Sequence, residues 1–435
     1  MNTLSSVNAN YNTLAMPGRS SAPQAACNCG SKDSVVLSGT RQRDEEPPTP
    51  PTPPAPEPPA PEPPPTPEPP PEPPPAPVTK KWTVMVYSAS DCNLYRFMQS
   101  DLDEAERVGS TETMHVIAQT DHGPRNGTAQ RIELVPDQTP GLKAPVKQDL
   151  GSYNMAAPEA LADFVKWGMK EYPAENYMLI ISDHGDGWKG AAQDWSHNGW
   201  MSTPDIEAGL KMAREETGKK IDVLGFDACL MASAEVAYQL KDEINYLVAS
   251  QEVEGGAGWE YNRVLSEGTL KSLDQKLSAT RFNMDPKQVA THVVICAQGN
   301  QDDLPTMSAI ETAKMPAVKR ALDNFADAMA TSQVSKDTFT TAAENTQGFY
   351  DYKDLSDFAN QVKTGVQAQD CYLAGAADRL MAAVSNAVVA EQHSDNYPGA
   401  KGMSIELHNT SSSDYANLKL SQDTQWDEAV AQMHS

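Results

Sequence analysis

The sequence has no long apolar segment. No stretch reaches the roughly 20 apolar residues that a membrane-spanning helix needs, and residues 1–27 lack the apolar core of a secretory signal peptide. We therefore expect no membrane span. Either the protein stays inside the cell or it leaves by a route that recognises another kind of tag, and the sequence does not decide between these.

Positive charge is also scarce. The chain has 34 Lys and Arg against 59 Asp and Glu, which gives a formal net charge of -25 and a pI of about 4.6. A nucleic-acid-binding surface needs clustered basic side chains to neutralise phosphates, and docking to anionic lipid needs them as well. The charge therefore argues against both classes of partner, whereas a site for basic side chains remains compatible with it.

Cysteine is sparse, and no metal-binding spacing is present. The chain contains no C-x-x-C, no H-E-x-x-H and no zinc-finger pattern, so we expect neither a disulfide framework nor a dedicated zinc site. The six cysteines are Cys27, Cys29, Cys92, Cys229, Cys296 and Cys371.

Composition divides the chain into three parts. Residues 1–46 are polar and without periodicity, so we expect them to be disordered. Residues 47–79 are dominated by Pro and Glu, which predicts a semi-rigid polyproline II spacer. A docking ligand for SH3-like domains is the alternative, but such ligands usually carry a basic residue and residues 47–77 have only Glu as charge. The globular domain is expected at 80–435.

The globular part alternates apolar runs with helix-length amphipathic stretches. The runs are continuous in Val, Ile, Leu and Met rather than alternating, which is typical of a mostly parallel sheet covered by helices on both faces. The fold class is therefore α/β. The predicted strands are 82–90, 114–121, 177–182, 221–226, part of 244–252, 306–311 and 402–408. The predicted helices are 94–108, 158–173, 203–218, 230–240, 274–299, 314–331, 335–345, 354–367, 370–392 and 424–433.

Two predicted strands end in residues that can do chemistry. The strand 177–182 is followed by Asp183, His184 and Gly185, and the strand 221–226 is followed by Asp227 and Cys229. Ligands of open parallel α/β sheets bind at the carboxyl ends of the strands. Because neighbouring strands lie about 4.8 Å apart, the imidazole and the thiol can meet if the two strands are adjacent or nearly so.

A thiol beside an imidazole is a nucleophile with its base. Few thiols ionise at neutral pH, so a histidine that takes the proton of Cys229 would activate it. The N–H of Gly185 and that of Cys229, expected at a helix start, could bind a substrate oxyanion. Packing roles for the cysteine and the histidine are the alternative, and Asp227 is either a cap of the following helix or the floor of a pocket. The residues alone leave these alternatives open.

The chain resembles the clostripain family of cysteine peptidases, within the caspase-like clan. The histidine segment and the cysteine segment are the most specific parts of the likeness, which extends over roughly 82–435. The matching segments are 82–104, 177–188, 222–240, 246–261, 306–311, 349–359 and 397–408.

The resemblance implies a caspase-like α/β/α sandwich and a role for each site residue. His184 would be the general base, Cys229 the nucleophile, and Gly185 and Cys229 the oxyanion donors. Asp227 would select Arg or Lys on the acyl side of the cleaved bond. The implied protein is a monomeric endopeptidase that acts on polypeptides and needs no cofactor for its chemistry. Its alternative is an inactive binding or surface-interaction protein on the same fold.

The resemblance also leaves specific questions. Some family members require calcium and others do not. In this chain the acid-rich turns with Asp183 and Asp186 are the candidate calcium sites. The family usually has Asn where this chain has Cys92. Many members cut themselves between the histidine and the cysteine, but no obvious loop with a basic residue is expected there, so self-processing is not predicted. The basic residues of that interval are Lys189, Lys211, Arg214, Lys219 and Lys220.

Overall fold

The computed structural model describes residues 79–266, 284–297, 304–366, 369–408 and 410–434. The predicted disordered segment 1–46 and the predicted spacer, apart from Thr79, lie outside the described residues. None of the described helices is long and apolar enough to cross a membrane.

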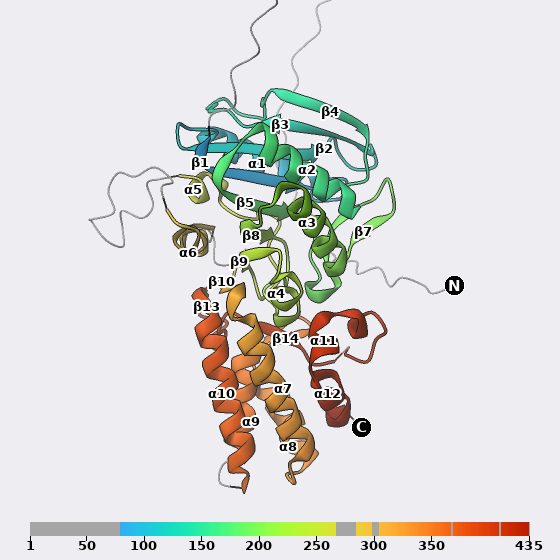
Figure 1. Ribbon diagram of the computed structural model, residues 1–435, viewed down its shortest axis with the longest axis vertical. Coiled ribbons are helices and arrows are strands. Elements are labelled where there is room, and N and C mark those ends of the chain that lie inside the picture. Colours follow the sequence, from blue (N-terminus) through green and yellow to red (C-terminus); the bar gives the residue numbers. More distant parts are fainter. Residues whose placement is uncertain (1–78, 267–283, 298–303, 367–368, 409, 435) are drawn as a thin grey trace, which may run out of the picture. The chain divides into compact units, whose positions relative to one another are not determined.

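A nine-stranded sheet forms the centre of the globular part (Figure 1). Its strand order is β13-β10-β9-β8-β5-β1-β2-β3-β4. The five central strands, from β9 to β2, pair in parallel, and two strands on each side pair antiparallel. The strands are β1 (Lys80–Ser88), β2 (Met114–Asp121), β3 (Thr128–Glu133), β4 (Val146–Ser152), β5 (Ala174–Ser182), β8 (Ile221–Asp227), β9 (Ile244–Ala249), β10 (Thr306–Glu311) and β13 (Val388–His393).

Two further small sheets flank the main one. One pairs β6 (Ala191–Asp194) with β7 (Gly199–Met201), and the other orders β11 (Gly348–Phe349), β12 (Tyr352–Asp354) and β14 (Ser404–Glu406). The first of them follows directly on the loop that carries the predicted catalytic histidine.

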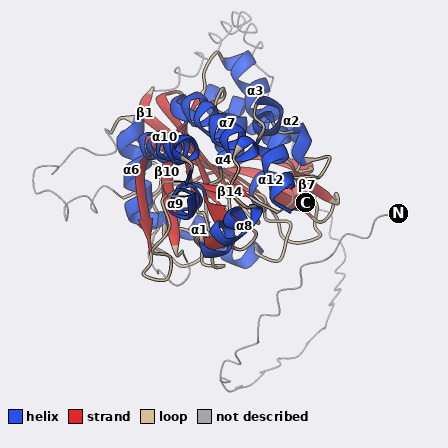
Figure 2. Cartoon of the chain, turned by 90° about the horizontal axis from the view of Figure 1, so that it is seen from below, coloured by secondary structure: helices blue, strands red, loops and turns tan. Residues whose placement is uncertain are grey.

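Helices cover both faces of the sheet, and Figure 2 shows them around the strands. The longer helices are α1 (Tyr95–Val108), α2 (Pro158–Glu171), α3 (Thr203–Thr217), α4 (Ala234–Leu240), α6 (Pro286–Ala297), α7 (Met315–Thr331), α8 (Lys336–Asn345), α9 (Leu355–Val366), α10 (Cys371–Ala387) and α12 (Trp426–His434). The short ones are η1 (Gly187–Lys189), α5 (Tyr261–Val264), η3 (Thr312–Lys314), η5 (Tyr415–Asn417) and α11 (Lys419–Asp423).

The two faces of the sheet contribute to two separate apolar cores. Trp82 and Val84 of β1 pack with α1, α5 and α6, whereas Met85 and Tyr87 of the same strand pack with α2, α3 and α4. Successive side chains of a strand point to opposite faces, so a strand buried on both faces must be apolar throughout. This explains the continuous apolar runs of the sequence and confirms the predicted α/β/α arrangement.

The structure differs from the predicted elements in several places. The predicted helix 370–392 ends at Ala387, and residues 388–393 instead form β13, which pairs with β10 at the edge of the sheet. The predicted helix 230–240 begins only at Ala234, where the Ser233 side chain accepts a hydrogen bond from the Val236 N–H. Strands β3 and β4 were not predicted, because the exposed and mostly polar β4 has no apolar pattern.

Candidate active site

The two predicted reactive residues follow neighbouring strands. β5 and β8 pair in parallel, and Ser182, the last residue of β5, lies opposite Asp227, the last residue of β8. His184 and Cys229 each follow two residues later, so they leave the sheet at matching positions. The condition under which the imidazole and the thiol could meet, adjacent strands, is therefore met.

The loops after these strands are in direct contact. A Cβ atom added to Gly185 would lie 3.0 Å from the Cys229 nitrogen and would also collide with the Cys229 carbonyl oxygen. Only glycine permits this approach of the two backbones. Among the described residues, neither the Gly185 N–H nor the Cys229 N–H donates a hydrogen bond to a protein acceptor. Both N–H groups are therefore without an acceptor in this part of the chain, which an oxyanion donor requires.

The His184 ring is held by a residue that the sequence analysis did not single out. His184 Nε2 lies 2.7 Å from Asn93 Oδ1. A carboxamide oxygen can only accept, so Nε2 carries the proton and Nδ1 keeps its lone pair. Burial lowers the pKa of His184, which favours the neutral ring that a general base needs. Asn93 follows β1, the strand on the other side of β5, so the strand-end argument applied to a third strand could have found it.

The Cys229 sulfur faces the segment after β9. The Glu254 N–H donates to Sγ over 3.3 Å, and the Glu254 carbonyl oxygen lies 3.7 Å from Sγ. Burial raises the pKa of the Cys229 thiol, so the thiol is protonated at neutral pH. Among the described residues, Sγ and the His184 ring do not hydrogen bond to each other. The thiol must therefore turn towards the imidazole before a proton can pass between them.

Asp227 is not a helix cap. Its carboxylate accepts hydrogen bonds from the Tyr261 hydroxyl (2.9 Å) and the Trp259 N–H (3.2 Å), while Ser233 caps α4. The capping interpretation of Asp227 is therefore wrong. The expected helix start at Cys229 is wrong as well, because α4 begins five residues later at Ala234 and its dipole does not act on the thiol.

Other acids surround Asp227 without a basic partner. Glu254 and Asp101 are 8% and 7% exposed, and neither oxygen of Glu254 makes a hydrogen bond of regular geometry. Burial raises the pKa of Asp227 to about 6, although its hydrogen bonds lower it. Burial followed by Asp227 raises the pKa of Asp101 to about 10, and burial with Asp227 and Cys229 raises that of Glu254. Among the described residues, no Lys, Arg or His forms an ion pair with these three acids. This excess of buried acid beside the thiol favours a cationic ligand.

The other described cysteines are poor nucleophiles. Cys92 is fully buried, and burial followed by Asp183 raises its thiol pKa. Cys296 is fully buried in α6, with its sulfur 3.4 Å from His292 Nδ1. Cys371 is exposed at the start of α10, away from the strand ends. Cys27 and Cys29 lie outside the described residues.

The acid-rich turns do not provide a calcium site. Both oxygens of Asp186 accept from Lys189 Nζ, at 3.1 and 3.0 Å. Asp183 lies beside the Cys92 thiol and the His184 imidazole, whereas calcium prefers a cage of oxygen ligands. The predicted turns therefore do not fit calcium, and no step proposed below uses it.

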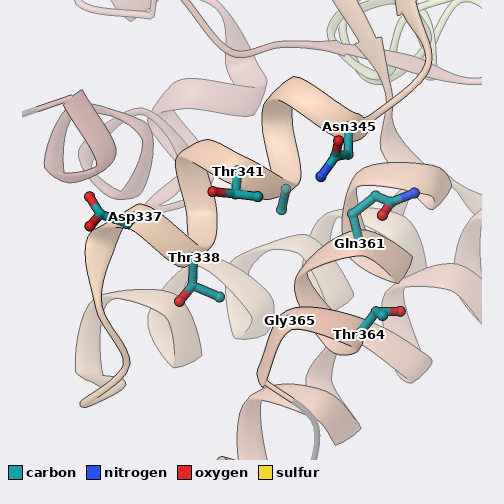
Figure 3. A pocket seen from close by; sticks show the side chains of 8 residues that line it. Asp337, Thr338, Thr341, Asn345, Gln361, Thr364 and Gly365 are labelled. Atoms are coloured by element: carbon teal, nitrogen blue, oxygen red, sulfur yellow. The ribbon is translucent and has the colours of Figure 1, made fainter.

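A surface pocket occurs among the helices between β10 and β13 (Figure 3). It lies between α8 and α9 and is lined by Asp337, Thr338, Thr341, Ala342, Asn345, Gln361, Thr364 and Gly365. Neither helix carries any of the predicted site residues, so we assign this pocket no part in the chemistry.

Comparison with known proteins identifies relatives over the same region. A sequence profile of the clostripain family matches residues 86–432. Clostripain from Hathewaya histolytica is 26% identical over 303 residues, which are 57% of this chain and 56% of that protein. The chain thus spans little more than half the length of this curated relative.

Solved structures share the fold. The structure of a secreted C11 cysteine protease from Bacteroides thetaiotaomicron, in complex with an irreversible peptide inhibitor, matches with a TM-score of 0.59 and 21% identity, and the match covers 80% of this chain and 99% of that one. An inactive zymogen C11 protease from Parabacteroides distasonis matches with a TM-score of 0.58 and 18% identity over the same shares. At these identities the likeness establishes a common fold.

Proposed function

The chain belongs to the clostripain family, and from this membership and the geometry of the site we propose that it is a cysteine endopeptidase that cleaves after Arg or Lys. The observation that carries the proposal is the contact of the two strand-end loops. This contact supports the proposal because the Gly185 backbone lies against that of Cys229, and His184 leaves the neighbouring strand at the matching position.

The proposed reaction runs through an acyl-thioenzyme. His184 Nδ1 takes the Cys229 proton while the sulfur attacks the substrate carbonyl carbon, and the Gly185 and Cys229 N–H groups bind the oxyanion that forms. The C–N bond then breaks, and the imidazolium gives its proton to the leaving amine. Water then hydrolyses the thioester. His184 takes a proton from the water while its oxygen attacks the carbonyl carbon, and the imidazolium returns the proton to the departing sulfur, which releases the acid product and the thiol.

Support for basic specificity comes from the acids beside the thiol. Asp227 is two residues from Cys229, and Glu254 binds the sulfur through its backbone. A guanidinium or ammonium group bound here would form ion pairs with these acids, which have no basic partner among the described residues. The resemblance assigns the same role to Asp227 alone, whereas the structure adds Glu254 and Asp101 to its surroundings.

The proposal is tested by covalent labelling. An arginyl chloromethyl ketone alkylates an active thiol with loss of chloride, and we expect one label per chain, mapped by peptide mass spectrometry to Cys229. A norleucyl ketone of the same length is the matched control and should react at least tenfold more slowly. Equal rates for the two ketones would remove the basic preference. Labelling of another cysteine, or none, would favour the inactive binding protein.

A further inference from the structure

A second group of reactive side chains includes the proposed catalytic histidine. A ligand atom of Cys92, one of Asp183 and one of His184 all lie within 4.8 Å of one another. The Cys92 sulfur lies 3.0 Å from Asp183 Oδ1, to which its thiol donates a hydrogen bond. The proposed reaction uses neither Cys92 nor the Asp183 carboxylate.

The sheet brings these three residues together. β1 and β5 are neighbours, and their last residues, Ser88 and Ser182, lie opposite each other. Cys92 follows the first strand, while Asp183 and His184 follow the second. Cys92 and Asp183 are 0% and 3% exposed, whereas His184 is only partly buried and leaves one side of the group accessible.

The three ligand types match one metal in particular. Thiolate, imidazole and carboxylate are the protein ligands of zinc, whereas calcium and magnesium prefer oxygen alone. Three protein ligands leave the fourth tetrahedral position for water.

Neighbouring groups already hold each ligand in place. The Leu94 N–H donates to Cys92 Sγ over 3.4 Å, the Gln193 N–H donates to Asp183 Oδ2, and Asn93 Oδ1 accepts from His184 Nε2. Such outer contacts orient metal ligands and support their affinity. The proton on Nε2 also leaves Nδ1 as the ring atom with a free lone pair.

We propose that Cys92, Asp183 and His184 bind one Zn²⁺ ion, and that this ion reversibly inhibits the peptidase. Binding replaces the S–H bond of Cys92 by a Zn–S bond, and the proton leaves to solvent without any change of oxidation state. The lone pair of His184 is then held by the metal and cannot accept the Cys229 proton. The inhibition rests on the proposed function, whereas the metal site does not.

The binding test uses the Cys229→Ala protein, so that zinc cannot bind the nucleophile. Competition with a chromophoric zinc chelator should give one tightly bound ion per chain. Cys92→Ser in the same background keeps a hydrogen-bond donor to Asp183 but replaces the soft ligand, and it should bind zinc at least tenfold more weakly. Cys92→Asn, which introduces the residue usual in the family, should lose as much zinc affinity. If either variant misfolds, the other still tests the site. Cys371→Ser, at an exposed thiol, should bind as the parent does.

The inhibition test uses proteins that retain Cys229. The zinc concentration that halves the hydrolysis of an arginyl substrate should rise at least tenfold in Cys92→Ser and stay unchanged in Cys371→Ser, each measured against its own rate without zinc. Unchanged affinity in both Cys92 variants would overturn the proposal, and so would loss of zinc binding on Cys229→Ala. If zinc binding depends on Cys92 but the protein with Cys229 has no peptidase activity, the metal site is supported and the proposed function is rejected.

Discussion

Two cysteine–histidine pairs among the described residues, Cys296 with His292 and Cys229 with His184, differ in burial and in hydrogen bonding. Cys296 and His292 lie one turn apart on α6, are 0% and 1% exposed, and approach to 3.4 Å between Sγ and Nδ1. Cys229 and His184 follow different strands, are only partly buried, and do not hydrogen bond to each other.

The difference shows that a hydrogen bond between thiol and imidazole does not identify a nucleophile. The α6 pair is enclosed in the core, so no substrate reaches it. The strand-end pair is only partly buried, and the Gly185 backbone lies against that of Cys229, so our proposal assigns the chemistry to this pair.

The largest effect is expected from removing one sulfur at a time. Cys229→Ala should lower kcat/KM for an arginyl peptide at least about 1,000-fold, because the covalent step is lost. Cys296→Ala should leave kcat/KM of the folded protein within about twofold, since that thiol does not reach substrate. Hydrolysis of a fluorogenic peptide measures both, and a large loss in Cys296→Ala alone would reverse the assignment of the two pairs.

Removing the charge beside the strand-end pair should have the next largest effect. Asp227→Asn keeps an acceptor for the Trp259 N–H but lacks the negative charge, so kcat/KM for arginyl substrates should fall about 30- to 1,000-fold. Hydrolysis after an uncharged residue should change by less than about threefold. The ratio of the two rates is the measurement, and a parallel loss of both with a lowered Tm would make Asp227 a purely structural acid.

The hydrogen bond between Asn93 and His184 should contribute a smaller factor. Asn93→Ala frees the ring, and we expect kcat to fall about tenfold with little change in KM, because substrate binding does not use this contact. Asn93→Asp also offers an oxygen to Nε2–H and should recover most of the lost rate. A change confined to KM, or no recovery with Asp, would contradict a positioning role.

The buried pair of Cys296 and His292 should affect the stability of the fold rather than the activity. Cys296→Ala removes a fully buried sulfur and its contact with His292, so the free energy of unfolding should fall by about 1–3 kcal/mol. Cys229→Ala should change it by less than about 1 kcal/mol. Urea unfolding followed by tryptophan fluorescence measures both, and the opposite order would place Cys229 in the core.

A buried acid that is hydrogen-bonded through one of its two oxygens offers the most specific test. Glu235 is fully buried and accepts from the Glu406 N–H and the Tyr415 hydroxyl. Burial raises its pKa from 4.5 to about 7, so the folded state holds this proton more tightly than the unfolded state. Its stabilising effect is therefore complete below pH 4.5 and is lost as the pH rises through 7.

The corresponding prediction compares two Glu→Gln changes. Glu235→Gln should flatten the decline in unfolding free energy between pH 5 and 8 by up to about 3 kcal/mol. Glu175→Gln, at a side chain that is 62% exposed, should leave the decline as in the parent. Urea unfolding across this pH range decides, and identical slopes for the two variants would reject the raised pKa of Glu235.

The sequence allowed much of this architecture to be predicted because its signals are local. A strand buried on both faces must be apolar at every position, which made β1, β5 and β8 recognisable, and the residues after them were then candidates by position alone. Where the local signal was weak, prediction failed: the polar edge strand β4 has no apolar pattern, and β13 continues the apolar run of α10.

Contacts between distant loops could not be predicted in this way. Asn93 meets His184 across 91 residues of chain, and Cys92 meets Asp183 across the same number. The absence of a metal spacing in the sequence therefore did not exclude a zinc-binding group, because its ligands follow separate strands. Glu254 and Asp101 also surround Asp227 only through the packing of the β9 loop and α1 on the end of the sheet.

The amino-acid pattern of each segment indicates which residues form strands and helices, that helices cover both faces of the central sheet, and which side chains follow the strands, because burial and chain direction act on neighbouring residues. Which strand ends are neighbours depends on the folded sheet. That order selects the partners of the thiol and the imidazole, and it follows from the packing of the whole sheet rather than from any one segment.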